Sequence, residues 1–168
     1  KAYGVELDSI SGRIAQQLYQ NASISVNGFE KVQMPDSFFD VVVGNVPFGD
    51  FKVMDKRYDK NNFLIHDYFF AKAIDKVRPG GVLALITSNG ISGGTFDKRD
   101  NKVRKYIAQR CDLIGAIRLP NNTFSQNAGA DITTDVLFFQ KLDRQRSTDV
   151  ETPDWVDVDI IHENDHVN

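Results

Sequence analysis

Short apolar segments alternate along the chain with longer amphipathic ones, which is the pattern of strands connected by helices. The short apolar segments predict strands at 2–7, 23–26, 38–44, 82–87, 111–119 and 135–142. The longer segments, with apolar residues at helical spacing, predict helices at 9–20, 63–77 and 97–110. Because helices separate most of the strands, we expect right-handed crossovers and a mostly parallel α/β sheet covered on both faces.

Two of these elements carry more specific expectations. The segment 38–44 is nearly all apolar, which is typical of a strand in a parallel sheet that is buried on both faces. Asp8 is expected to cap the first helix, because its carboxylate can accept hydrogen bonds from the first backbone amides. Ile10, Ile14 and Leu18 have helical spacing and share one face of that helix.

The last two predicted strands are joined by a long polar connection without a helix, so we expect an antiparallel pair at the edge of the sheet. After residue 142 the chain becomes polar. We therefore expect one α/β domain over 1–142. Over 143–168 we expect a polar linker, with an added strand or the start of a following domain. The first residues enter directly on a strand, so we also expect the chain to be a piece of a longer protein.

Composition narrows the class of protein without naming a function. The 168 residues are 41% hydrophobic and 26% charged, as in ordinary globular domains. No apolar run approaches the roughly 20 residues that span a bilayer, so we expect no membrane partner. The single cysteine, Cys111, excludes an intramolecular disulfide and a multi-cysteine zinc site, and is consistent with a cytoplasmic location. No cluster of ligand residues predicts a metal, and the net charge of −3 requires any basic patch to be local.

The strand at 38–44 ends on the polar and aromatic sequence Asn45-Val46-Pro47-Phe48. Ligands of open α/β sheets bind beyond the carboxyl ends of strands. The Asn45 side-chain oxygen and the next backbone carbonyl are two neighbouring acceptors, which suit the two N–H donors of a planar amine. Pro47 stiffens the turn, and Phe48 offers a face for stacking. These residues alone therefore indicate an amine held beside an aromatic ring.

Residues 45–48 resemble the Asn-Pro-Pro-(Tyr/Phe) motif of the S-adenosylmethionine-dependent adenine-N6 DNA methyltransferases. Residues 4–8, Gly-Val-Glu-Leu-Asp, are similar to that family's second strand, and residues 78–86 to its fifth. Residues 118–124 and 134–139 look like the closing segment of the type I restriction-modification and helicase-fused branches. The resemblance extends over about residues 2–142 and implies a Rossmann-like class I methyltransferase sheet.

The resemblance implies S-adenosylmethionine as the cofactor. Glu6 would hold the ribose hydroxyls, while Leu7 and Phe29 would lie against the cofactor adenine. In the family the target adenine is flipped out of the duplex, and its amine attacks the methyl group. Asn45 and the Val46 carbonyl would orient that amine.

Further residues would contact the DNA. Phe124 would help to hold the flipped base, and a basic run on the helix at 97–110 would contact phosphates through Lys98, Arg99 and Lys102. The run continues with Arg104 and Lys105, and a solvated helix face is the competing interpretation. Double-stranded DNA is thus the implied partner, with further domains or subunits for target recognition.

Two departures from the family pattern qualify these expectations. Val46 stands where the family has its first proline, so we expect a less rigid loop that keeps the carbonyl acceptor. The family's first strand and glycine-rich cofactor loop would precede residue 4, and the sequence lacks both. We therefore expect an N-terminally truncated domain that binds the cofactor poorly by itself.

Two other functions remain open at this point. The same motif would fit enzymes that methylate the side-chain amide of glutamine in proteins, since that nitrogen is also a planar amine. A non-catalytic module, in which the fold serves as a DNA-binding or assembly platform, is the alternative from another class.

Overall fold

The computed structural model describes residues 1–88, 100–123, 133–147 and 152–157. The strands are β1 (Tyr3–Glu6), β2 (Ser23–Val26), β3 (Phe39–Asn45), β4 (Val77–Ser88), β5 (Cys111–Leu119) and β6 (Thr134–Lys141). The helices are α1 (Ser9–Leu18), α2 (Ile65–Lys76) and α3 (Lys102–Ala108), with short 3-10 turns η1 (Phe29–Lys31), η2 (Asp59–Asn61) and η3 (Asp154–Val156). The six strands and three helices predicted over 2–142 are present, with boundaries shifted by a few residues. Residues 97–99 of the helix predicted at 97–110, and most of the added strand considered for 143–168, lie outside the described residues.

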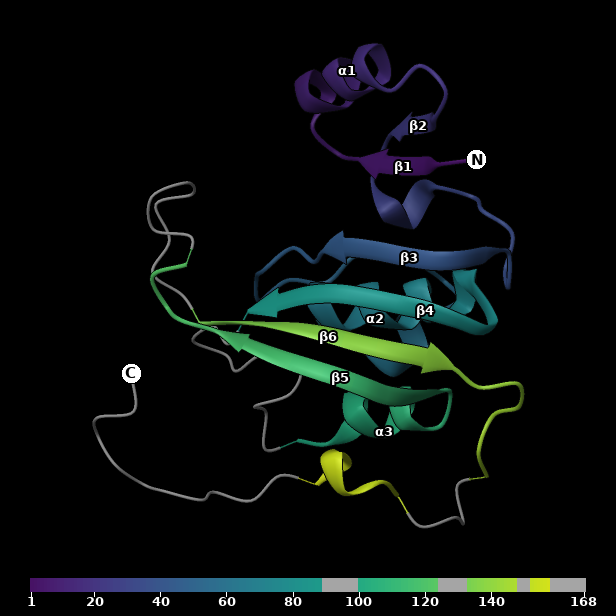
Figure 1. Cartoon of the computed structure of the whole chain (residues 1–168), viewed down its shortest axis with the longest axis vertical. Coiled ribbons are helices and arrows are strands. Elements are labelled where there is room, and N and C mark those ends of the chain that lie inside the picture. Colours follow the sequence, from purple (N-terminus) through teal and green to yellow (C-terminus); the bar gives the residue numbers. More distant parts are fainter. Residues whose placement is uncertain (89–99, 124–132, 148–151, 158–168) are drawn as a thin grey trace.

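The strands form two sheets, one of order β3-β4-β6-β5 and one in which β1 pairs with β2. The pairs β1–β2 and β3–β4 are parallel, while β6 is antiparallel to both of its neighbours. Figure 1 shows β6 running against the direction of the other strands. The predicted mostly parallel sheet with an antiparallel pair at its edge is confirmed. The outermost strand of that pair is β5, and the reversed strand lies just inside it.

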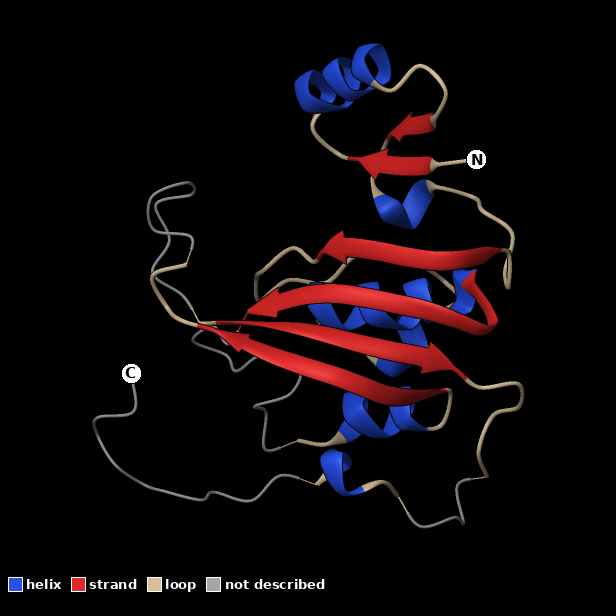
Figure 2. Cartoon of the chain, in the orientation of Figure 1, coloured by secondary structure: helices blue, strands red, loops and turns tan. Residues whose placement is uncertain are grey.

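One face of the four-stranded sheet is covered by α2, α3 and η3 (Figure 2). The hydrophobic core lies on this side and includes Phe70 and Ile74 of α2 together with Leu83, Leu137 and Phe139 of the sheet. The described tail joins it, because Val156 is fully buried and the Trp155 ring lies 6.0 Å from that of Phe139. No helix of the described residues is long and apolar enough to cross a membrane.

The face of β3 that points away from α2 is exposed, so the prediction that residues 38–44 are buried on both faces is wrong. Val41 and Val43 are 57% and 72% exposed. Their side chains alternate with those that face α2, and no helix among the described residues covers this side (Figure 2). The expectation that both faces of the sheet are covered is therefore wrong for this part of the molecule.

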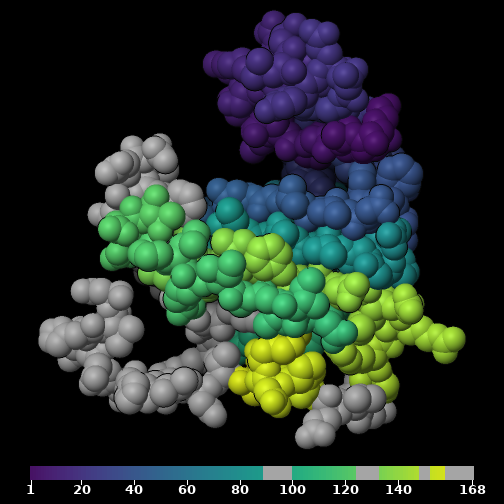
Figure 3. All heavy atoms as spheres, viewed as in Figure 1, coloured from purple at the N-terminus to yellow at the C-terminus, as the bar shows by residue number. Residues whose placement is uncertain are grey.

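The segment β1–α1–β2 forms a separate lobe at the N-terminal end (Figure 3). Asp8 caps α1 as predicted, since its carboxylate accepts a hydrogen bond from the Ser11 amide at 2.7 Å. The apolar side chains that share one face of α1 are exposed: Ile10, Ile14 and Leu18. The Tyr3 ring contacts Phe38 and Phe39 near the start of β3, at 5.8 and 5.3 Å between ring centroids. β1 and β3 do not pair, so among the described strands each has a hydrogen-bonded neighbour on one side alone.

Candidate active site at the carboxyl ends of the strands

The Asn45–Phe48 motif lies where β3 ends, and its backbone is anchored to β4. Asn45 is in register with Ile86, and the Val46 amide donates a hydrogen bond of 3.0 Å to the Ile86 carbonyl. The Val46 side chain is only 1% exposed and belongs to the core, whereas Asn45 is exposed. Val46 is thus held by packing and by a hydrogen bond that proline could not donate. This anchoring offsets the loss of stiffness expected from the missing first proline.

A second exposed ring follows the aromatic residue of the motif in the same loop. Phe48 is 44% exposed and Phe51 is 54% exposed. The Phe51 carbonyl accepts a hydrogen bond of 2.9 Å from the Ile65 amide at the start of α2, which returns the loop to the core. Gly49 lies between the two rings in the chain, and a Cβ added there would come within 2.6 Å of the Phe51 ring. Sequence reasoning singled out Phe48 and missed Phe51, although both rings follow the same strand.

The neighbouring strand ends add polar groups whose roles were not predicted. Thr87 of β4 is in register with Asp135 of β6, which is in register with Arg118 of β5. Arg118 donates two hydrogen bonds of 2.9 Å to the Asp135 carboxylate. Within the described part of the chain, the buried hydroxyls of Thr87 and Thr134 have no hydrogen-bond partner. Polar groups therefore gather at the strand ends beside Asn45.

The predicted cofactor residues lie at the carboxyl ends of β1 and β2. The Glu6 carboxylate accepts a hydrogen bond of 2.8 Å from the Asp8 amide, and the Glu6 carbonyl accepts one from Asn27 at 2.9 Å. Leu7 is 76% exposed, so its side chain is open to a ligand. Phe29 is half-buried and packs its ring against Phe69, with 5.0 Å between centroids. Glu6 and Leu7 are thus brought close to the end of β2, while Phe29 also serves the core.

The predicted DNA-contacting residues are only partly described. Phe124, Lys98 and Arg99 lie outside the described residues. Lys102 donates a hydrogen bond to the Asn61 carbonyl and lies over the Phe63 ring, so its amine has partners within the molecule.

The continuation of the basic run toward the end of α3 does not form one exposed face. Arg104 is fully buried and donates a hydrogen bond of 2.6 Å to the Val156 carbonyl, whereas Lys105 is exposed. Among the described residues, no group of His, Cys, Asp and Glu side chains could hold a metal ion.

The fold is that of a class I S-adenosylmethionine-dependent methyltransferase. Such an enzyme from Listeria monocytogenes superposes with a TM-score of 0.64 at 22% identity, over 91% of this chain and 47% of that one. The M protein of the type I restriction enzyme EcoKI gives a TM-score of 0.63 at 19% identity, over 86% of this chain and 32% of that one.

The sequence places the chain more narrowly. Residues 2–124 match the Eco57I restriction-modification methylase family, and the chain belongs to that family. It is 36% identical over 141 residues to the defense against restriction protein B of Escherichia phage P1. It is 30% identical over 110 residues to the methylase subunit of the type I restriction enzyme EcoEI of Escherichia coli. These matches cover 81% and 63% of this chain but only 6% and 22% of the two relatives, respectively.

The cofactor of this class of enzymes is S-adenosylmethionine. The described residues fit its nucleoside half in chemical type. The Glu6 carboxylate is an acceptor suited to ribose hydroxyls, and the exposed Leu7 is an apolar surface suited to a purine. At Gly28, between Asn27 and Phe29, an added Cβ would come within 2.3 Å of the Glu30 carboxylate, so the Glu30 side chain lies directly against this turn.

Proposed function

We propose that the chain is part of an enzyme that transfers a methyl group from S-adenosylmethionine to the N6 amine of adenine in DNA. The observation that carries the proposal is the Asn45–Phe48 motif at the end of β3. It presents an exposed amide and an exposed aromatic ring on a backbone that β4 holds in place. Membership of the restriction-modification methylases supports DNA as the substrate.

In the proposed reaction the adenine amine donates two hydrogen bonds, one to the side-chain oxygen of Asn45 and one to the backbone carbonyl of Val46. Two acceptors out of the ring plane draw the amine toward tetrahedral geometry and free its lone pair for attack. The bound cofactor would supply an electrophilic methyl group on sulfur. Transfer would form the N–C bond and release S-adenosylhomocysteine. The amine held by Asn45 and Val46 would lose its proton only afterwards, so no base would be needed before transfer. Phe48 stacks on the base.

On the cofactor side, we propose that Glu6 binds the ribose hydroxyls and that Leu7 and Phe29 contact the cofactor adenine. On the DNA side, we propose that Lys98, Arg99 and Lys102 contact phosphates and that Phe124 contacts the flipped base. The relatives are much longer than this chain. Further domains or subunits would therefore choose the DNA sequence, as part of the same proposal.

The test is a methyl-transfer assay on the chain, alone and within the longest reading frame that contains it. Labelled S-adenosylmethionine and unmethylated DNA are incubated, and the digested nucleosides are examined for N6-methyladenine. We expect Asn45→Ala to lower the rate at least about a hundredfold, or about 2.7 kcal/mol of transition-state stabilisation. Asn21→Ala, in an exposed turn of the N-terminal lobe, is the matched control and should leave the rate unchanged.

Three other outcomes would change the proposal. Product that survives Asn45→Ala would remove that residue from the reaction. Label on protein glutamine instead of adenine would favour the protein-amide substrate. Failure to bind the cofactor in the longest form would leave a non-catalytic platform.

Glu6→Gln tests the cofactor side separately. Glutamine keeps an oxygen acceptor for the Asp8 amide, so the fold of the lobe is preserved. The loss of a charged acceptor should weaken cofactor binding about tenfold, as expected for a hydrogen bond to a charged group. Calorimetric titration with S-adenosylhomocysteine measures the effect, and Asp143→Asn on the exposed tail is the control. An unchanged dissociation constant would remove Glu6 from the cofactor site.

A further inference from the structure

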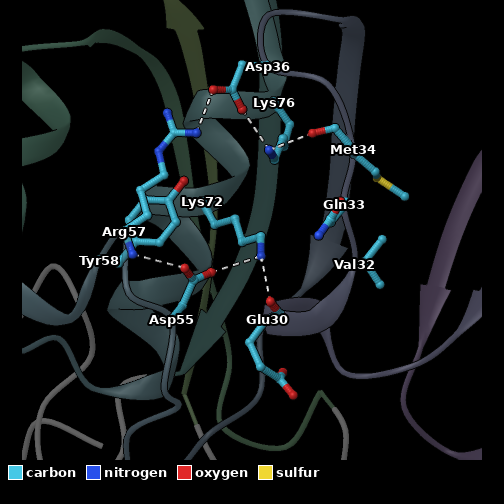
Figure 4. A pocket seen from close by; sticks show the side chains of 10 residues that line it. All are labelled: Glu30, Val32, Gln33, Met34, Asp36, Asp55, Arg57, Tyr58, Lys72 and Lys76. Atoms are coloured by element: carbon cyan, nitrogen blue, oxygen red, sulfur yellow. Dashed lines mark hydrogen bonds and ion pairs between the residues drawn. The ribbon is translucent and has the colours of Figure 1, made fainter.

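One polar face of α2 is buried instead of facing solvent. Tyr68, Lys72 and Lys76 follow one another at a spacing of four residues and are each less than 8% exposed. The two lysines, with Tyr58 of the loop between β3 and α2, line a cavity of about 440 Å³. Figure 4 shows this cavity between two stretches of chain, one before β3 and one after it. The polar face of α2 therefore lies under both stretches.

Lys72 binds both stretches through a single ammonium group. Its Nζ lies 3.0 Å from the Asp55 carboxylate and donates a hydrogen bond of 3.3 Å to the Glu30 carbonyl. The same nitrogen lies 5.1 Å from the centre of the Phe29 ring. Tyr68 donates a further hydrogen bond of 2.8 Å to Asp55. These partners compensate the buried charge of Lys72. Removing either Lys72 or Asp55 would leave the other as a buried charge without its counter-charge, which is destabilising.

The two stretches belong to different halves of the proposed site. Glu30 follows Phe29, which lies just beyond the carboxyl end of β2 where the cofactor adenine is proposed to bind. Asp55 lies in the loop that leads from Phe48 to α2. The distance between these halves is not fixed by strand pairing, because β1 and β3 do not pair. Side chains on α2 are therefore a direct connection between them.

We propose that Lys72 is a positioning residue that sets the cofactor segment at Phe29–Glu30 and the loop after Asn45–Phe48 relative to each other. The catalytic meaning of this contact rests on the function proposed above, whereas the physical link does not. Lys72 contacts neither the proposed amine acceptors nor the proposed ribose site. It acts through Asp55 and the Glu30 carbonyl.

A second link on the same face explains why loss of Lys72 should loosen the site without unfolding the domain. Lys76 donates hydrogen bonds to the Met34 carbonyl at 2.8 Å and to Asp36 at 2.7 Å. The stretch before β3 thus keeps one attachment to α2. The loop after β3 keeps the hydrogen bond from Tyr58 to Asp75, which is 2.6 Å long.

Amide hydrogen exchange on the 168-residue chain tests the link directly. In Lys72→Met we expect about tenfold faster exchange in both 28–34 and 47–58, with β4 and β6 unchanged. Tyr58→Phe is the matched control, because it removes a hydrogen bond from the loop alone, so only 47–58 should respond. Lys72→Arg keeps the charge and should restore most of the protection. Faster exchange in only one stretch for Lys72→Met would overturn the proposal.

Asp55→Asn keeps the test decisive if Lys72→Met unfolds the chain. It removes the partner charge, and it too should affect both stretches, because the ammonium that holds Glu30 then loses its counter-charge. In the double variant the effects should not add, because both changes break the same contact. Independent, additive effects would contradict a shared role.

The positioning role also requires a functional readout. We expect Lys72→Met to weaken the binding of S-adenosylhomocysteine and to lower kcat of the form active in methyl transfer, each about tenfold, with rescue by Lys72→Arg. Tyr58→Phe should lower kcat and leave cofactor binding unchanged. If the exchange pattern is found but both parameters stay normal, the role in positioning is refuted. If the unaltered protein shows coupled exchange but no methyl transfer, the proposed function fails while the link stands.

Discussion

Val46 shows how one residue can fix a backbone carbonyl without the ring of proline. Its side chain fills the core, its amide binds the Ile86 carbonyl, and the chain then turns away from the sheet. These contacts hold the backbone from two sides. The rigidity that proline at the position of Val46 would supply locally comes here from tertiary contacts.

Replacing Val46 with proline should therefore destabilise this protein. The substitution keeps the carbonyl but removes the N–H, leaving the Ile86 carbonyl without its donor. We expect a loss of about 1–3 kcal/mol in the free energy of unfolding, measured by urea denaturation. Val46→Ala is the control, since it shortens the side chain and keeps the amide. A proline variant no less stable than the alanine variant would show that the hydrogen bond has no net value.

Cys111 offers a second prediction at the scale of a residue. Burial raises the pKa of its thiol to about 12, so the thiolate is scarce at neutral pH. In the native protein at pH 8 the thiol should not react with an aromatic disulfide reagent over minutes, and in urea it should react fully. Rapid reaction of the folded protein would mean that the start of β5 opens readily.

At the scale of the element, α2 was predicted correctly as a helix, but the surroundings of its polar face were not predicted. The pattern of residues 63–77 is that of an amphipathic helix and does not say what its polar face contacts. In the structure, loops on both sides cover that face. Whether a polar face is solvated depends on distant segments that carry matching groups, here Asp55 and the carbonyls of Glu30 and Met34. Local periodicity carries no information about them.

The ion pairs on α2 predict how stability depends on pH. Burial would raise the pKa of the Asp55 carboxyl, but hydrogen bonds from Lys72 and Tyr68 outweigh it and hold the pKa below its usual value of 3.8. Burial would also raise the pKa of the Asp36 carboxyl, but hydrogen bonds from Lys76 and Arg57 hold that pKa below its usual value. A lowered pKa means that the stabilisation is present above about pH 4 and is lost as the pH falls through the folded-state value.

The measurement is the free energy of unfolding by urea between pH 7 and pH 3. We expect a decline that begins below about pH 4. Asp55→Asn should have a lower free energy of unfolding at pH 7. That free energy should also fall less steeply in acid, because the variant lacks the carboxylate that takes up a proton on unfolding. An equally steep acid decline in the variant would place the linkage elsewhere.

The strands illustrate the same limit on prediction. Runs such as 82–87 and 111–119 are apolar enough to be recognised as strands from the sequence alone. The end of β3 also lies where the sequence predicted it. The position of Thr87 opposite Asp135, and the hydrogen bonds from Arg118 to Asp135, depend on the order and register of β4, β6 and β5. Strand order arises from packing of the whole sheet, so these neighbours of the site could not be foreseen.

At the scale of the molecule, the chain consists of a four-stranded sheet with its helices and a smaller lobe that contains β1, α1 and β2. We propose that both belong to one methyltransferase domain over 1–142, to which the described tail attaches through Val156. The rings of Tyr3, Phe38 and Phe39 form a contact between lobe and sheet, where no strands pair. Few shared contacts predict separate stabilities.

Tyr3→Ala should loosen the lobe and leave the main sheet intact. Amide exchange in β1 and β2 should be faster than in β4 and β6 already in the unaltered chain, and the substitution should widen the difference. Tyr19→Ala is the control, because this ring is 63% exposed. Equal protection of lobe and sheet in both variants would indicate a single cooperative unit.

The reversal of β6 has a consequence for how such a domain can diverge. In a parallel crossover the connecting segment leaves the carboxyl end of one strand and must return to the opposite end of the sheet, where the next strand begins. Because β5 and β6 are antiparallel, β5 ends and β6 begins at the same end of the sheet, which is also the end that carries Asn45. Insertions or deletions between Leu119 and Thr134 can therefore change the end of the sheet that carries Asn45 without changing how β5 and β6 pair.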